Sequence, residues 1–169
     1  LGSVTEKVVR LSEVPVLTAR MRPDERLRFP YESVLVPTDG SDGAMAAAHH
    51  GLGLAESLGA SVHVLSVVDD TWMGPEARST ITEAELERPA KEAIDDVAET
   101  AASYDVPAVQ THVEHGPPAT RIGEFVNSND VDAVVMGTSG RSGLGRVLLG
   151  SVAEKTVRTA PVPVITVPP

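Results

Sequence analysis

The residues whose types and spacing most clearly indicate a chemical role are glycines and a serine near the C-terminal end of the sequence. Residues 137–152 follow the pattern Gly-x2-Gly-x9-Gly-Ser, formed by Gly137, Gly140, Gly150 and Ser151. A phosphate group can approach the backbone amides of glycine closely, because no side chain blocks it. Gly150 and Ser151 also open an expected helix, whose free amides and positive dipole end favour anions. The pattern therefore predicts a phosphate-binding loop, with a plain connecting loop as the alternative.

Two common nucleotide-binding patterns are missing from the sequence. It has neither Gly-x4-Gly-Lys-Ser/Thr nor a Gly-x-Gly-x-x-Gly that opens a helix directly after the first strand. Arg141 and Arg146 lie inside the glycine-rich loop and could neutralise phosphate charge. Exposed arginines in an acidic protein are at least as often simply solvated, so both interpretations stay open.

Strand-like and helix-like segments alternate from residue 31 onward and must position this loop. Apolar, β-branched runs predict strands at 33–37, 61–68, 108–113, 131–136 and 162–167. Helix-forming composition and apolar spacings of three and four predict helices at 44–58, 82–103, 117–126 and 151–158, with Asp42 as a cap of the first. This order predicts an α/β fold, with a doubly wound, open, parallel five-stranded sheet and helices on both faces.

Ligands of such sheets bind beyond the carboxyl ends of strands, where the strand order reverses. Asp39 and Gly137 both follow or end an expected strand, so we expect them to share one site. His115, at the end of another strand, could border the same site. His49 and His50 have no further ligands nearby in the sequence and are discounted as a metal site.

Composition excludes several classes of protein. The chain has 169 residues and a formal net charge of −10, which argues against nucleic acid as a partner. It has no cysteine, so disulfides and thiolate chemistry are excluded. Without a long apolar run or a signal peptide, we expect a soluble, cytoplasmic protein with no membrane segment. High acidity with little lysine fits adaptation to high salt and an ordinary acidic cytosolic protein about equally.

The two ends of the chain repeat one another. Residues 1–18 align without gaps to residues 149–166, and twelve of these eighteen positions are identical. We interpret residues 1–19 as the last helix and strand of a preceding repeat, 20–30 as a linker and 31–169 as a complete domain. We expect residues 14–18 to pair as a strand with the edge strand 162–167, either within one chain or between two.

Four segments in this order resemble the universal stress protein family: 34–41 (Val-Leu-Val-Pro-Thr-Asp-Gly-Ser), 64–69, 136–140 and 149–152. The resemblance covers residues 31–167, and the intact glycine pattern is similar to that of the ATP-binding branch. It implies an adenine nucleotide alpha hydrolase-like, Rossmann-like fold and bound ATP or AMP. It also implies a homodimer through the last strand and ATP hydrolysis that is slow or absent.

The resemblance implies a nucleotide site whose residues are Pro37, Thr38, Asp39, Val67, Met136, Gly137, Ser139, Gly140, Gly150, Ser151 and Val152. Asp39 would lie near the ribose or a phosphate-bound magnesium ion, although an Asp before Gly is also a common turn residue. Val67 would meet the adenine and Met136 would line the base pocket, with a plain core position as the alternative for both. Ser139 occupies a variable position, and its role stays open. No residue is assigned as catalytic or as a direct metal ligand.

Three functions follow from these interpretations. The first is a regulatory, stress-response protein that binds ATP or AMP. The second is a slow ATPase, for which the sequence shows no clear base or charge clamp. The third is a ligand-free interaction domain of a larger protein, such as a regulatory domain that follows a transporter.

Overall fold

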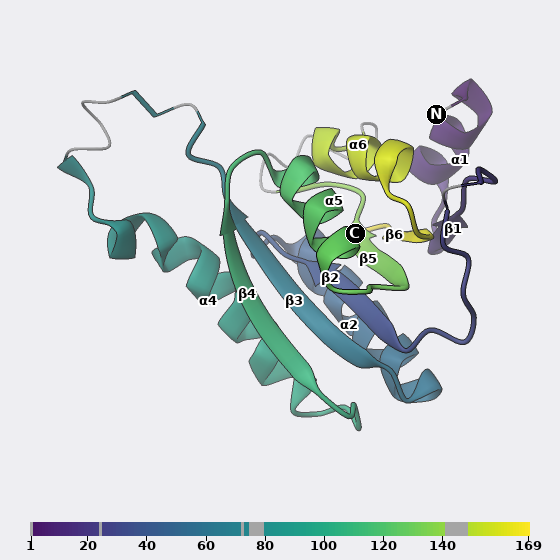
Figure 1. Ribbon diagram of the computed structural model, residues 1–169, viewed down its shortest axis with the longest axis horizontal. Helices are drawn as coiled ribbons and strands as arrows, with labels where there is room; N and C mark the ends of the chain where they lie inside the picture. Colours follow the sequence, from purple (N-terminus) through teal and green to yellow (C-terminus); the bar gives the residue numbers. More distant parts are fainter. Residues whose placement is uncertain (1, 24, 72, 75–79, 141–148) are drawn as a thin grey trace.

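The protein is built around one mixed sheet of six strands. The computed structural model describes residues 2–23, 25–71, 73–74, 80–140 and 149–169. The strand order is β1-β6-β5-β2-β3-β4 (Figure 1). The strands are β1 (Val16–Thr18), β2 (Ser33–Pro37), β3 (Ser61–Val68), β4 (Val109–His115), β5 (Ala133–Gly137) and β6 (Val164–Val167). The five predicted parallel strands are confirmed, and β1 adds an antiparallel edge strand beside β6.

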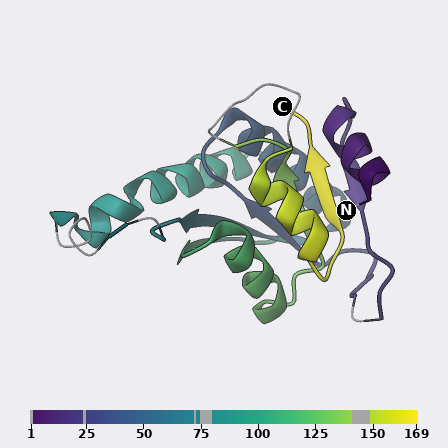
Figure 2. The ribbon, with the colours of Figure 1, turned by 90° about the horizontal axis from the view of Figure 1, so that it is seen from above.

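Helices cover both faces of the sheet (Figure 2). They are α1 (Ser3–Leu11), α2 (Asp42–Leu58), α4 (Glu83–Ala101), α5 (Pro118–Ser128) and α6 (Ser151–Thr159). Residues of α2 and α4 pack with Val34 and Val36 in one buried cluster, and residues of α5 and α6 pack with Leu35 in another. This alternation along β2 is what a strand buried on both faces requires, because successive side chains point to opposite faces. The predicted fold class is therefore confirmed.

The start of α2 differs from the sequence-based expectation by one residue. Asp42, expected to be the cap, is the first helical residue, and the N-cap is Ser41. The Ser41 hydroxyl accepts a hydrogen bond from the amide of Ala44 at 3.2 Å. Asp42 lies in the first turn, where its negative charge interacts favourably with the positive end of the helix dipole.

Three glycines allow α2 to lie very close to the sheet. A Cβ at Gly51 would stand 2.8 Å from Cγ2 of Val36 on β2. A Cβ at Gly137 would stand 2.7 Å from the backbone oxygen of Gly43, and one at Gly43 would stand 2.9 Å from the backbone oxygen of Ser139. The missing side chains thus fix the beginning of α2 against the end of β5.

The N-terminal helix and strand repeat α6 and β6 in structure as well as in sequence. With the sequence offset of 148, the bounds of α1 correspond to those of α6 residue by residue. β1 pairs antiparallel with β6, and Leu17 lies opposite its own counterpart, Ile165. The Thr18 hydroxyl donates to the Val164 carbonyl at 3.1 Å, and the Thr166 hydroxyl donates to the Val16 carbonyl at 3.2 Å. The expected strand pairing is confirmed for residues 16–18, within one chain, while residues 14–15 lie outside the strand. The pairing has the form of a two-fold symmetric contact.

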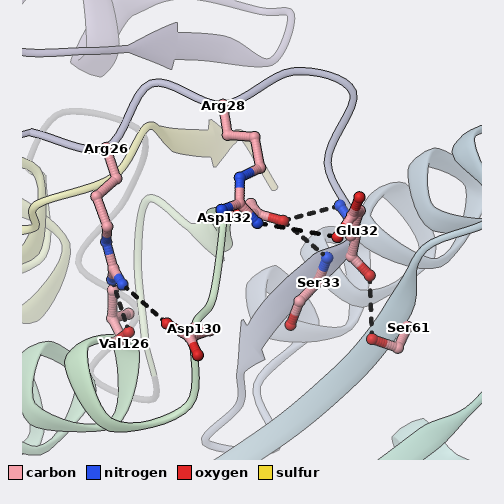
Figure 3. A network of polar contacts seen from close by, with 8 residues as sticks. All are labelled: Arg26, Arg28, Glu32, Ser33, Ser61, Val126, Asp130 and Asp132. Atoms are coloured by element: carbon pink, nitrogen blue, oxygen red, sulfur yellow. Dashed lines mark hydrogen bonds and ion pairs between the residues drawn. The ribbon is translucent and has the colours of Figure 1, made fainter.

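The segment between β1 and β2 is attached to the domain by arginine side chains. The Arg20 guanidinium donates to the carbonyls of Arg158, Thr159 and Ala160, which are left open at the C-terminal end of α6. Arg26 donates to the Val126 carbonyl at 2.8 Å, at the other helix on this face (Figure 3). The described residues of the expected linker, 20–23 and 25–30, therefore run along the domain surface, held to it by Arg20 and Arg26.

A buried carboxylate joins the beginnings of β2 and β5. Asp132 is only 5% exposed, and its Oδ2 accepts hydrogen bonds from the amides of Glu32 at 2.8 Å and Ser33 at 3.1 Å (Figure 3). Nη1 of Arg28 lies 3.7 Å from Oδ1 of Asp132. These contacts satisfy the backbone at the start of β2 and place the strand in register.

Two histidines on neighbouring strands form a partly buried pair beneath α5. Nδ1 of His63 lies 3.1 Å from Nε2 of His112, and both rings contact the ring of Phe125. Burial lowers the pKa of each imidazole below its usual value, and the neighbouring His112 lowers that of His63 further. The pair is therefore poorly suited to carry positive charge.

We expect this pair to make the protein less stable in mild acid. The unfolded histidines bind protons at a higher pH than the folded ones, so stability falls as the pH drops below about 6.5 towards the folded pKa values. Urea unfolding of wild type and His112→Gln at about pH 7.5 and 5.5 checks this, and the variant should lose less stability. His50→Gln, which changes an exposed imidazole, is the control; equal losses in all three proteins would contradict the expectation.

Candidate functional site

A cavity of about 380 Å³ lies at the carboxyl ends of the central parallel strands. All eleven residues named from the sequence line it: Pro37, Thr38, Asp39, Val67, Met136, Gly137, Ser139, Gly140, Gly150, Ser151 and Val152. They come from the ends of β2, β3 and β5 and from the beginning of α6. This is the edge where the chain passes from one side of β2 to the other, the usual ligand position in such sheets.

The polar end of the cavity is organised by the turn that follows β2. Oδ1 of Asp39 accepts hydrogen bonds from the amide and the hydroxyl of Ser41, at 3.0 and 2.6 Å. Gly40 takes a positive φ of 77°, and its amide donates to the Thr38 hydroxyl at 3.2 Å. Asp39 therefore does form a turn, as the alternative interpretation held, and it also lines the cavity.

The beginning of α6 forms another wall of the cavity. The N-cap is Gly150, and no described side chain caps this helix. The Gly150 amide donates to the Thr138 carbonyl at 2.8 Å, which holds the helix start against the end of β5. Ser151, Val152 and Ala153 follow in the first turn and line the cavity. An uncapped helix start that faces a cavity offers backbone amides and a positive dipole end to an anion.

The other end of the cavity is apolar. Met136 is buried at the end of β5, and Val67 is half-buried on β3. Ile122 and Pro118 of α5 complete this end, together with Leu65. An aliphatic wall next to a polar, amide-rich wall suits a ligand with a flat apolar ring at one end and an anionic group at the other.

Six lining residues were not predicted from the sequence: Ala44, Leu65, Pro118, Ile122, Thr138 and Ala153. Thr138 and Ala153 directly adjoin predicted residues and could have been included by position. Ile122 and Leu65 read as ordinary core residues, because only the packing of α5 on β3 brings them to the cavity. His115 is absent from the lining residues that the structure describes, and its ring instead contacts Glu87.

The absence of a side chain has a different structural reason at each of the two loop glycines, Gly137 and Gly140. The sequence suggests that Gly137 and Gly140 leave room for phosphate. A Cβ on Gly137 would instead meet the backbone of α2, so its lack of a side chain serves packing. A Cβ on Gly140 would stand 2.6 Å from Oδ2 of Asp39, inside the cavity lining. Arg141 and Arg146 lie outside the described residues.

The open sheet with a cavity at its strand-order reversal, a glycine-rich loop and an uncapped helix start defines an α/β protein of the Rossmann-like class. A family model described as the universal stress protein family matches residues 30–168. Universal stress protein MJ0531 of Methanocaldococcus jannaschii is 36% identical over 156 residues, which are 90% of this chain and 89% of that protein. The chain belongs to the universal stress protein family.

Solved structures agree with this assignment. The structure of UspA from Lactobacillus plantarum matches with a TM-score of 0.74 at 29% identity, covering 83% of this chain and 99% of that chain. A universal stress protein from Archaeoglobus fulgidus matches with a TM-score of 0.69 at 26% identity. That match covers 99% of this chain but 54% of the Archaeoglobus chain, so it includes the N-terminal helix and strand.

Proposed function

We propose that this protein binds ATP or AMP in the cavity and acts as a nucleotide-dependent regulatory protein in a stress response. The observation that carries the proposal is the convergence of the eleven sequence-predicted residues, from separate parts of the chain, on one cavity. A solved universal stress protein of the same fold was determined in complex with cAMP, at 21% identity and a TM-score of 0.63. That likeness concerns the fold, and it supports the capacity of this architecture to hold an adenine nucleotide.

In the proposed arrangement the adenine lies at the apolar end, against Val67 and Met136. The phosphates lie against the amides of Gly140 and of the first turn of α6, where the helix dipole favours negative charge. Asp39 would repel a bare phosphate, so it lies next to the ribose or to a magnesium ion carried by the phosphates. The residues present thus fit a nucleotide with magnesium, and the ion would offset the charge between Asp39 and the phosphates.

Calorimetric titration with ATP, ADP and AMP tests the proposal, with a micromolar or tighter dissociation constant expected for ATP or AMP. Gly140→Val should weaken this binding by about 100-fold or more, which is about 2.7 kcal/mol. The valine would displace Asp39 and occupy part of the cavity. The experiment thus tests the binding and its location together.

Gly74→Val is the matched control, because no atom of the described residues lies within 4 Å of a Cβ at that position. It should bind nucleotide like the wild type. Absence of heat and of a thermal shift at millimolar nucleotide would refute the proposal. Normal affinity in a folded Gly140→Val variant would place the site elsewhere.

A slow ATPase is the second possibility for the same cavity. In-line attack by water needs a base or an orienting group and a charge clamp. Among the described lining residues, Asp39 is the one ionisable side chain, and it is already engaged by Ser41. We therefore expect phosphate release under saturating ATP to be very slow, and steady turnover would favour the enzyme.

We further propose that residues 31–169 are the C-terminal copy of a tandem pair. On α1, Val4 and Val8 are 73% and 50% exposed, whereas the counterpart of Val8 on α6, Thr156, is buried. The apolar face of α1 therefore matches one that α6 packs against its own sheet, as expected for the end of a preceding domain.

We place the protein in the cytoplasm; no helix in the described parts of the chain is long and apolar enough to cross a membrane.

A further inference from the structure

Two carboxylates and one imidazole meet outside the nucleotide cavity, where α4 begins next to the end of β4. Glu83 and Glu87 stand one helical turn apart on α4 and so face the same side. Together with His115 at the end of β4, each offers one ligand atom, and these atoms all lie within 4.8 Å of one another. Glu83 is exposed, whereas Glu87 and His115 are half-buried. The three side chains are thus held by two different elements at the protein surface.

The spacing suits ligands that surround one small cation. Nε2 of His115 lies 2.9 Å from Oε1 of Glu87. Two ligand atoms that are each about 2.1 Å from an ion stand about 3.0–3.4 Å apart at right or tetrahedral angles. A divalent ion can therefore replace the proton that these two atoms share, with little movement of either side chain. Glu83 then supplies a third ligand from the preceding turn.

The remaining atoms of two of these side chains already have outer partners. Oε2 of Glu87 pairs with Nζ of Lys91 at 2.7 Å, which leaves Oε1 as the oxygen that faces His115. Nδ1 of His115 faces Oδ2 of Asp70 at 4.0 Å. In metal sites such outer contacts orient the ligands, and a carboxylate on the second ring nitrogen of a ligating histidine is a recurrent one. The cluster thus has inner and outer groups of the kinds that a metal site needs.

We propose that Glu83, Glu87 and His115 bind a divalent transition-metal ion of the zinc class. The imidazole nitrogen selects against magnesium and calcium, which prefer oxygen ligands alone, and favours zinc and its neighbours. Three protein ligands leave the other positions of the ion to water. The site is separate from any magnesium carried by a nucleotide at Asp39. It lies close to the cavity in the chain, since His115 precedes the lining residue Pro118 by three positions.

Zinc titration of the full chain without nucleotide tests the site, by calorimetry in the presence of a weak competing chelator. We expect one saturable equivalent of zinc. Glu83→Gln and His115→Gln should each weaken binding by more than about tenfold. Glu83 is exposed, so its variant should keep the fold, which circular dichroism and thermal melting would verify.

Matched controls separate this site from adventitious binding by an acidic surface. Glu92→Gln changes an exposed carboxylate further along α4, and His50→Gln changes an exposed imidazole on α2. Asp39→Asn removes a carboxylate that lines the nucleotide cavity. All three should bind zinc like the wild type. The proposal is overturned if the wild type shows no saturable zinc binding or if Glu83→Gln and His115→Gln bind zinc normally. It is also overturned if the three controls lose as much zinc affinity as these two site variants.

Discussion

Replacing Gly137 by alanine should destabilise the protein by about 2–3 kcal/mol, the upper part of the range of about 1–3 kcal/mol that overpacking costs. The added Cβ would lie 2.7 Å from the Gly43 oxygen and 2.9 Å from the Gly43 carbonyl carbon. These are backbone atoms at the beginning of α2, so no side-chain rotation can relieve the contact. The start of α2 must move away from β5, and the walls of the cavity move with it. We therefore expect loss of nucleotide affinity together with stability, measured by urea unfolding and calorimetry.

Gly123→Ala is the matched control for this substitution. Gly123 lies within α5, and in the part of the chain that the structure describes no atom stands within 4 Å of a Cβ there. Alanine is a better helix former than glycine by up to about 1 kcal/mol, so this variant should be slightly more stable than the wild type. If Gly137→Ala unfolds at the same urea concentration as the wild type, the inference that α2 lies too close to β5 for a side chain at residue 137 is wrong.

Removing residues 1–20 should convert the protein into a dimer that pairs through β6. The truncation exposes the backbone amides and carbonyls of β6 that now bond to β1, and open strand edges associate. It also removes the Arg20 guanidinium from the three carbonyls at the end of α6. We expect a loss of about 2–4 kcal/mol in the stability of the truncated monomer. Light scattering after size exclusion, with hydrogen exchange at β6, measures both the association and its location.

The double variant Val4→Lys, Val8→Lys provides the control for the truncation. It removes the exposed apolar face of α1 but keeps β1 in place. Its oligomeric state should equal that of the full chain, because the edge of β6 stays covered. A truncated protein that keeps the oligomeric state of the full chain would exclude β6 as the dimer contact. The homodimer through the last strand thus remains a prediction, and in this structure β1 occupies the edge that it would use.

The sequence predicted most of the sheet because aliphatic, β-branched runs alternate regularly with amphipathic or alanine-rich segments. The repeat of residues 1–18 added the partner of the edge strand, which periodicity alone could not supply. The contacts of Arg20 and Arg26 were not predictable, since they join residues a hundred or more positions apart. An arginine in a charged, proline-flanked segment gives no indication of which helix end it will reach.

The sequence predicted those cavity residues whose type suits a ligand and which also follow an expected strand, namely the loop glycines and the residues after β2. The contributions of α5 could not be predicted, because Pro118 and Ile122 reach the cavity only through the packing of that helix on the sheet. The same holds for His115 and Glu87, which are 28 positions apart and meet because α4 lies against the end of β4. The packing role of Gly137 was not predicted for a related reason: α2, which its missing side chain lets approach, begins almost a hundred residues earlier.

The paired strands β1 and β6 are two copies of one sequence joined in a single chain. A symmetric contact of this kind between separate molecules would dissociate on dilution, since its occupancy depends on protein concentration. Here residues 19–32 tether β1 to the sheet, which gives the strand an effective local concentration of the order of millimolar. The edge of β6 therefore stays covered even when the protein is scarce.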